Sequence, residues 1–224
     1  MEAENIYTRT AALLGEGGLR RLQNSSAAVF GVGGVGGYVA EALIRAGIGR
    51  LALIDGDVFR ESNLNRQIFA LKSTLGRNKA EAARERLLDI NGAADITAYP
   101  FFFNAGTAGR FDFKAFDYVA DAIDSVADKV LLIKTAKECG TRIISSMGAG
   151  GKIYSDFKAG DIFETSGCPL ARVMRRKLKE AGVERLKCVY SEEGGAGTAG
   201  SVPYVPGVCG LVMAGEVIRE LCGI

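Results

Sequence analysis

The chain has 224 residues, of which 48% are hydrophobic and 24% are charged. These proportions are ordinary for a globular protein, and the length allows a sizeable core, so wholesale disorder and a disulfide-stapled mini-protein are both excluded. The 28 basic and 26 acidic residues nearly cancel. Such a balance does not indicate a general nucleic-acid-binding protein, although it allows a local basic patch.

Residue types that are absent or few exclude several kinds of chemistry. The chain has no histidine, which excludes an imidazole base, a Ser-His-Asp triad and a histidine-ligated metal. Its five cysteines form no C-x-x-C pair, which argues against a structural zinc site and a secreted disulfide framework. The start is acidic, unlike a signal peptide, and charges interrupt the apolar stretch over 208–224. We therefore expect a cytoplasmic protein with no membrane span.

Hydrophobic periodicity predicts alternating helices and strands along most of the chain. The expected helices cover 8–23, 38–45, 79–90, 126–139, 169–181 and 208–221. The expected strands cover 27–30, 51–54, 94–99, 118–123, 142–145 and 187–190. Short, continuously apolar strands that alternate with helices are typical of parallel βαβ units. We expect an α/β fold with a Rossmann-like, doubly wound, mostly parallel sheet and an irregular C-terminal extension, with ligands at the carboxyl ends of the strands.

A glycine-rich turn joins the first predicted strand to the following helix. Its candidate phosphate-binding members are Gly31, Gly33, Gly34 and Gly36. Glycines let the backbone approach a phosphate at a helix N-terminus. Asp55 ends the next predicted strand, where a carboxylate accepts hydrogen bonds from ribose hydroxyls, and Asp57 competes for this role. The pattern favours nucleotide binding; tight strand-to-helix packing without a ligand is the alternative.

Polar residues after this acidic strand end separate an ATP enzyme from a nicotinamide dehydrogenase. A loop supplies Asn63 and Arg66, and Lys79 begins the next predicted helix. Together these groups concentrate positive charge where the outer phosphates of a triphosphate would lie. Either cation alone would be an ordinary surface charge.

Five ordered motifs over residues 29–125 resemble those of the ubiquitin-activating-enzyme-like adenylating superfamily, which includes ThiF and MoeB type sulfur-carrier activators. They are the glycine motif, Leu-Ile-Asp55-Gly-Asp, Ser62-Asn-Leu-Asn-Arg66-Gln, Gly-Arg-Asn-Lys79 and Asp121-Ala-Ile-Asp124-Ser. Within the superfamily, the chain more closely resembles the tRNA threonylcarbamoyladenosine dehydratases. Further segments carry this likeness, among them Tyr7-Thr-Arg9-Thr, 145–150, 165–175, 188–191 and 200–206.

The resemblance implies an enzyme that uses ATP to adenylate the threonyl carboxylate of N6-threonylcarbamoyladenosine in tRNA. Ring closure then removes water overall and releases AMP, after the release of pyrophosphate. The implied nucleotide-binding residues are the four glycines, Asp55 or Asp57, Asn63, Arg66, Lys79, Asp124 and Ser125. Asp124 would hold Mg²⁺, with a helix N-cap as its alternative role. Arg9 would reach the active site of the other subunit of a homodimer.

The same resemblance divides one adenylating domain over 1–224 into a nucleotide-binding core at 1–150 and an extension at 151–224. The extension would bind substrate and tRNA and mediate dimerisation. Seven basic and two acidic residues lie between 172 and 187, and the candidate tRNA contacts are Arg172, Arg175, Arg176, Lys177 and Lys179. A solvated helix face is the alternative for this charge run. The glycine-rich stretch over 193–200 is either an RNA contact or a loop.

Other functions and roles stay open. Cys168 precedes a basic helix and is a candidate nucleophile, but we favour packing, the usual fate of a free cysteine. The alternative function is an adenylyltransferase that activates the C-terminal Gly-Gly of a ubiquitin-like sulfur carrier; the missing C-x-x-C pairs weigh against it. A nicotinamide oxidoreductase and a non-catalytic subunit fit less well. Whether a sulfur-transfer partner protein cooperates is left open.

Overall fold

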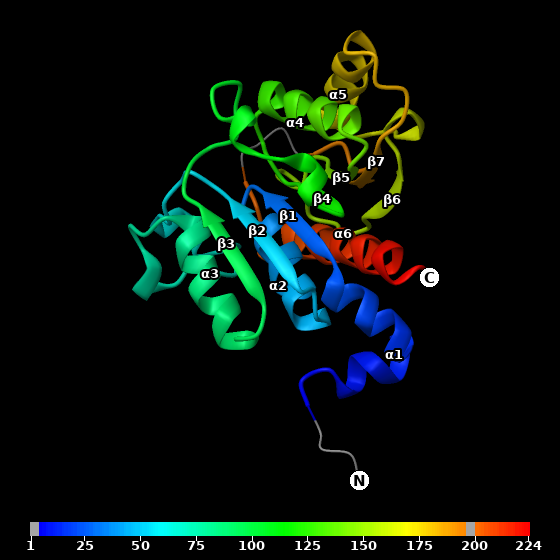
Figure 1. Ribbon diagram of the computed structural model, residues 1–224. Helices are drawn as coiled ribbons and strands as arrows, with labels where there is room; N and C mark the ends of the chain where they lie inside the picture. Colours follow the sequence, from blue (N-terminus) through cyan, green and yellow to red (C-terminus); the bar gives the residue numbers. More distant parts are fainter. Residues whose placement is uncertain (1–4, 196–199) are drawn as a thin grey trace.

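The computed structural model describes residues 5–195 and 200–224. Its seven-stranded sheet has the order β3-β2-β1-β4-β5-β7-β6 (Figure 1). Neighbouring strands are parallel except β6, which runs antiparallel to β7. The strands are β1 (Ser26–Phe30), β2 (Arg50–Ile54), β3 (Asp95–Tyr99), β4 (Tyr118–Asp121), β5 (Arg142–Ser146), β6 (Lys158–Asp161) and β7 (Lys187–Tyr190). The mostly parallel α/β sheet that the sequence predicts is thus confirmed.

The described part of the chain forms the six expected helices. They are α1 (Thr8–Asn24), α2 (Gly36–Ala46), α3 (Lys79–Ile90), α4 (Val126–Glu138), α5 (Pro169–Glu180) and α6 (Tyr204–Cys222). α1 is kinked at Gly15, whose φ of 71° is not helical. α6 begins four residues before its predicted start, because Pro206 lies in the first turn, where the missing N–H breaks no helical hydrogen bond. Within the described residues, no helix is long and apolar enough to cross a bilayer.

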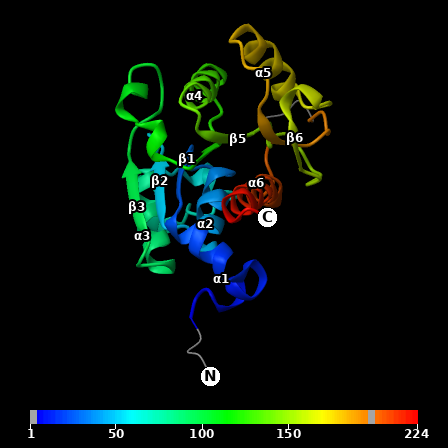
Figure 2. The ribbon, with the colours of Figure 1, turned by 45° about the vertical axis from the view of Figure 1, so that its right-hand side comes forward.

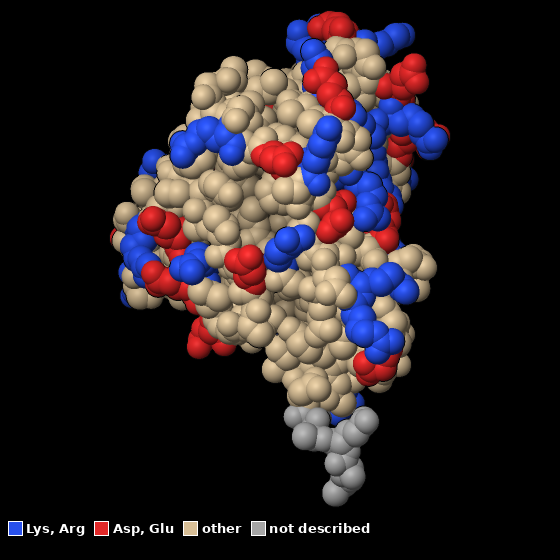
Figure 3. Space-filling model, in the orientation of Figure 1, with Lys and Arg blue, Asp and Glu red and all other residues tan. Residues whose placement is uncertain are grey.

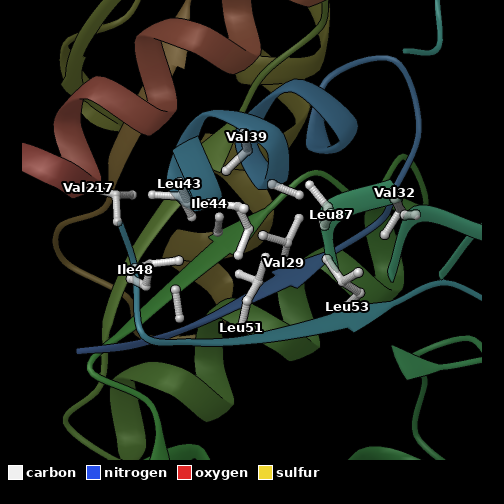
Figure 4. Close-up of a cluster of buried hydrophobic side chains, with 14 of the residues drawn as sticks. Val29, Val32, Val39, Leu43, Ile44, Ile48, Leu51, Leu53, Leu87 and Val217 are labelled. Carbon is white, nitrogen blue, oxygen red and sulfur yellow. The ribbon is translucent and has the colours of Figure 1, made fainter. Parts of the chain in front are cut away.

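Two hydrophobic clusters sandwich the sheet. On one face α2, α3 and α6 pack on the strands, and Leu43 and Ile44 of α2 point toward Val29, Leu51 and Leu53 (Figure 4). On the other face lie α4, α5 and a phenylalanine-rich segment after β3 (Figure 2). Each fully buried Leu, Ile, Val or Phe contributes about 1.5–3 kcal/mol relative to an exposed one. This burial on both faces explains why the central strands read as continuous apolar runs.

The β6 strand was not predicted, and its sequence explains why. Lys158–Asp161 has only one apolar side chain besides a glycine, and all four residues are exposed or half-buried. An edge strand of this kind carries too little hydrophobic pattern to be distinguished from a loop. Its partner β7, buried against α6 and the second cluster, was predicted correctly.

The strand order places a crevice at the centre of the sheet. The chain progresses outward from β1 through β2 to β3, and then returns to add β4 on the other side of β1. In doubly wound sheets ligands bind at this switch point, outside the carboxyl ends of the strands. Backbone hydrogen bonds fix those ends here: the Gly31 N–H donates to the Ile54 carbonyl at 2.8 Å, and the Ala122 N–H donates to the Phe30 carbonyl at 2.8 Å.

Candidate active site

A cavity of about 980 Å³ lies at the carboxyl ends of the central strands. Its volume is at the upper end of the usual range for small-molecule sites. The walls come from the glycine-rich turn, the end of β2, the 62–67 loop, the start of α3, and the loops after β4 and β5. The predicted site residues on these walls are Gly31, Gly33, Gly34, Asp55, Asp57, Arg66, Lys79, Asp124 and Ser125.

The glycine-rich turn is held by close backbone contacts. Gly31 has a φ of 87°, and a Cβ there would lie 2.6 Å from the Ala122 carbonyl oxygen. A Cβ on Gly36 would lie 1.8 Å from the carbonyl oxygen of Gly31, which excludes any side chain. Gly36 is absent from the cavity wall, so it shapes the turn while Gly33 and Gly34 face the cavity. The amino end of α2 therefore opens toward the cavity.

The two acidic residues after β2 have different surroundings. Asp55 is 8% exposed. Its carboxylate accepts hydrogen bonds from the Val32 N–H at 2.7 Å and the Asp57 N–H at 2.8 Å. Burial raises the pKa of Asp55 above its usual value, although these two hydrogen bonds act in the opposite direction. The carboxylate is thus fixed in place by backbone groups and faces the cavity.

Asp57 instead pairs with a buried lysine. Lys79 is 6% exposed, and its Nζ lies 2.8 Å from Asp57 Oδ2, while Arg60 Nη2 lies 3.1 Å from Asp57 Oδ1. Partial burial by itself raises the pKa of Asp57, but the hydrogen bonds from Lys79 and the Val58 N–H and the two nearby cations together lower it. Asp57 therefore stays ionised at neutral pH and holds the lysine against the cavity wall.

The 62–67 loop presents Arg66 but not Asn63. Asn63 is buried at the end of a 3-10 turn, η1 (Glu61–Asn63), and its Oδ1 accepts the Arg60 N–H at 3.0 Å. It is absent from the wall, so the structure does not bring it together with the other predicted phosphate ligands. Asn65 lines the cavity in its place, and its Oδ1 accepts a hydrogen bond from Arg66 Nη1 at 3.0 Å.

The loop after β4 brings carboxylates to the other side of the cavity. Asp124 is exposed and faces the cavity. Its alternative role as a helix N-cap is wrong, because Ser125 is the N-cap residue of α4. Asp128, in the first turn of α4, lies on the same wall and was not predicted. Its position four residues after Asp124 was the available signal. Within the described residues, no cluster of three or more His, Cys, Asp or Glu could hold a metal by itself.

Further wall residues were also missed from the sequence. Phe102 is 58% exposed and lines the cavity beside the buried Phe103. Gly56 makes room for it, since a Cβ there would lie 2.6 Å from the Phe102 nitrogen. Gln67 is 7% exposed, and its Oε1 has no hydrogen-bond partner among the described residues. An unpaired acceptor on a cavity wall is available to a donor on a ligand.

Arg9 and Cys168 also lie away from the cavity wall. Arg9 is exposed near the start of α1. Tyr7 lies two residues before Arg9, and its hydroxyl accepts a hydrogen bond from the Asn91 side chain at the end of α3. Cys168 is 2% exposed as the N-cap residue of α5, and its Sγ would lie 3.4 Å from a Cβ on Gly148. This burial favours the packing role of Cys168.

The basic helix α5 begins at the cavity, where Leu170 forms part of the wall. Figure 3 shows basic and acidic side chains interleaved on this side of the molecule. Arg175 is half-buried and donates to the Thr165 carbonyl at 2.8 Å, which makes it a structural residue. Lys177 pairs with Glu180 at 3.0 Å, and Arg176 lies 3.9 Å from the same carboxylate. Arg172 and Lys179 are exposed and have no ion-pair partner within the described residues.

The site and the fold agree with comparisons to known proteins. A model of the ThiF family matches residues 7–224. The chain belongs to the ThiF family. It is 36% identical to a tRNA threonylcarbamoyladenosine dehydratase of Bacillus subtilis, over 96% of this chain and 94% of the relative. The crystal structure of the Escherichia coli tRNA N6-threonylcarbamoyladenosine dehydratase in complex with ATP matches with a TM-score of 0.92 and 32% identity, over 97% and 93% of the two chains.

A relative with a different activity matches a smaller part of the chain. The adenylyltransferase and sulfurtransferase UBA4 of Saccharomyces cerevisiae is 34% identical over 61% of this chain and 31% of its own length. The match to the B. subtilis dehydratase covers nearly all of both chains. Among the members of this ThiF family, the dehydratases are therefore the better guide to function.

Replacing Asn63 and Asn65 separately with alanine tests which of them contributes to ATP binding. Asn65→Ala removes one of the two acceptors of Arg66 Nη1, the other being the Ser62 carbonyl at 2.8 Å, so we expect weaker ATP binding with little change in Tm. Asn63→Ala removes the buried acceptor of the Arg60 N–H and lowers stability by about 1–3 kcal/mol. Calorimetric titration with ATP and thermal denaturation measure the two effects. Weaker ATP binding by Asn63→Ala at unchanged Tm would contradict this assignment.

Proposed function

We propose that this chain is an ATP-dependent tRNA threonylcarbamoyladenosine dehydratase. The observation that carries the proposal is the cavity at the switch point, which combines a glycine-rich helix start with Arg66, Lys79 and four carboxylates. The ThiF family match and the near-complete alignment with dehydratases support the same activity. The bound ATP in the matched E. coli structure supports a triphosphate in this cavity.

The wall residues favour one direction for a bound nucleotide. Asp55, fixed by two backbone N–H groups, would accept hydrogen bonds from the ribose hydroxyls. Because Gly56 adjoins Phe102, the exposed ring lies on the ribose side and offers a stacking surface for the adenine. The phosphates would then lie over Gly33 and Gly34 at the start of α2, within reach of the cations.

Arg66, Lys79 and Mg²⁺ would share the charge of the triphosphate. Asp124 and Asp128 supply carboxylate oxygens on the cavity wall, the donors that Mg²⁺ prefers, and nucleotide enzymes commonly use one or two carboxylates together with substrate phosphates. The residues therefore fit this ion. When bound, it would add positive charge beside the phosphate oxygens. Lys79, kept in place by Asp57, would supply its charge from the opposite side.

The chemistry needs no histidine. The threonyl carboxylate is already ionised at neutral pH, so it attacks the α-phosphorus of ATP without a general base. Pyrophosphate leaves and a mixed anhydride with AMP remains. The carbamoyl group of the same modification then attacks the activated carbonyl carbon and loses a proton, and AMP departs with the carboxylate oxygen. This nucleophile is tethered to its target, so proximity accelerates ring closure and no cysteine thioester is required.

Nucleoside mass spectrometry tests the proposal. We expect the chain, incubated with ATP, Mg²⁺ and tRNA that carries the threonylcarbamoyl mark, to remove the mass of one water from that nucleoside. Lys79→Ala should slow the change by about 100-fold or more, since one preorganised cation is lost. Lys114→Ala, an exposed lysine outside the cavity, is the matched control. Adenylation of a sulfur carrier's Gly-Gly terminus without tRNA dehydration would favour the alternative instead.

We further propose a homodimer in which Arg9 acts on the partner's cavity. The ring of Tyr7 packs against Gly47 at the end of α2, and its hydroxyl bonds Asn91 at the end of α3. These helix ends lie at the amino edge of the sheet, opposite the cavity (Figure 1). Arg9 is therefore too far from its own cavity to take part there. Ile6 and Leu13 beside it are 61% and 85% exposed, which offers apolar surface for a partner.

A mixed dimer tests whether Arg9 acts across the interface. Arg9→Ala and Lys79→Ala homodimers should each be nearly inactive. A mixed dimer, co-expressed with two affinity tags and purified through both, contains one complete site and should recover about half the wild-type rate. A mixed dimer as inactive as its parents would show that Arg9 does not act in trans, and a monomer in light scattering would exclude the dimer.

We also propose that the outer face of α5 follows the tRNA backbone. Leu170 places the start of this helix at the cavity, and Arg172 and Lys179, two turns apart, have no ion-pair partner within the described residues. Such charges are available to phosphates. Arg175, bonded to Thr165, is assigned to the fold instead. The proposed tRNA contact on α5 therefore includes fewer basic residues than the composition of the helix predicts.

Charge reversal on α5 tests the RNA contact. Arg172→Glu/Lys179→Glu should weaken tRNA binding and reduce the slope of log affinity against log salt by about 2, one for each lost phosphate contact. Affinity for ATP should not change. Lys114→Glu/Lys134→Glu changes the net charge equally at exposed positions on other elements. Equal weakening by both double variants would show a general charge effect and not a contact at α5.

A further inference from the structure

A fully buried ion pair lies directly behind the loop that carries Asp124. Asp121 and Lys129 are both 0% exposed, and Lys129 Nζ lies 2.9 Å from Asp121 Oδ2. Asp121 ends β4 and Lys129 lies in the second turn of α4, so the pair bridges the two ends of the 122–125 loop. The residues of that loop all line the cavity.

The pair forms hydrogen bonds with both the N–H and the carbonyl of Ile123 in this loop. Asp121 Oδ1 accepts the Ile123 N–H at 3.1 Å, and Lys129 Nζ donates to the Ile123 carbonyl at 2.9 Å. The backbone immediately before Asp124 is thereby fixed by two charged groups. Hydrogen bonds to charged groups are shorter and stronger than those between neutral groups.

The same pair connects the loop to two neighbouring strands. Ser145 Oγ on β5 donates to Asp121 Oδ2 at 2.6 Å, and the next residue, Ser146, lies on the cavity wall. On the other side, the Ala122 carbonyl lies so close to Gly31 that a Cβ there would be 2.6 Å away. Displacement of the Ile123 peptide would therefore disturb the glycine-rich turn, the Asp124 loop and the end of β5 together.

Stability alone gives little reason for this arrangement. A buried ion pair commonly contributes no more stability than apolar side chains of similar volume, because both charges lose their hydration. The surrounding side chains of this layer, such as Val119, Leu132 and Ile133, are apolar. A pair placed one residue from the cavity wall is better explained by the geometry that it imposes.

We propose that Lys129 and Asp121 are positioning residues that set the direction of the Asp124 carboxylate toward the phosphates. This inference rests on the proposed function, since it assumes that Asp124 serves a bound triphosphate. Neither side chain touches the cavity, so both act through the Ile123 peptide. Because small displacements of a positioned group cost large rate factors, loss of the pair is expected to reduce ATP use strongly.

A double-mutant cycle with Asp124 tests the proposal. Lys129→Met alone leaves a buried unpaired carboxylate and risks unfolding, so the variant that we choose is Asp121→Asn/Lys129→Met. It removes both charges, and the carboxamide introduced on β4 keeps an acceptor for the Ile123 N–H. On the wild-type background it should weaken ATP binding and lower kcat/KM for ATP by about tenfold to 100-fold. On the Asp124→Asn background it should change either value by less than about threefold, because coupled residues are not additive.

The controls separate positioning from loss of fold. Glu41→Gln removes another buried carboxylate with two basic partners, Arg45 and Arg86, at positions of α2 and α3 that do not line the cavity. It should lower Tm without changing ATP affinity. The proposal would be overturned if the Asp121/Lys129 variant lowered ATP affinity and kcat/KM by the same factor on both backgrounds, or changed them on neither.

The two readouts distinguish this inference from the proposed function. If the wild-type chain binds ATP but does not dehydrate tRNA, the proposed function fails, while the cycle in ATP affinity still decides the role of the pair. A wild-type chain that does not bind ATP would overturn both.

Discussion

The site depends on a contact between two stretches of backbone. The turn after β1 and the loop after β4 approach so closely that Gly31 has no room for a side chain, and within the turn the Gly31 carbonyl leaves none for Gly36. This contact closes the floor of the crevice at the switch point and directs the amino end of α2 toward the cavity. The charged groups come from two segments, one that follows β2 and one that follows β4, and this contact holds the ends of β1 and β4 together.

The charges around this floor are arranged in two opposed sets. Asp57 fixes Lys79 on one side, and Asp124 and Asp128 face the cavity from the other. A triphosphate placed between them would meet fixed cations directly and the carboxylates through a metal ion. In the proposed reaction this division would let a chain without histidine activate a carboxylic acid, because that reaction requires stabilisation of negative charge and no proton abstraction.

Local sequence patterns were sufficient to predict the buried strands and most of the charged residues that line the cavity. Continuous apolar runs identified the buried strands, and the spacing of the glycines, Asp55, Arg66 and Lys79 predicted residues that the structure brings to one cavity. The sequence did not show that Asn65 and not Asn63 lines the cavity, because the η1 turn determines the direction of these side chains. Phe102 was missed since its exposure depends on its packing over Gly56. The functional roles of these residues remain predictions.

The antiparallel edge strand β6 has a consequence for association of the sheet. A further strand added there would have to pair with Lys158–Asp161, a four-residue segment with a charge at each end. Short, charged edges of this kind resist the addition of foreign strands. β6 therefore ends the sheet on this side with a strand that is poorly suited to edge-to-edge pairing with another chain.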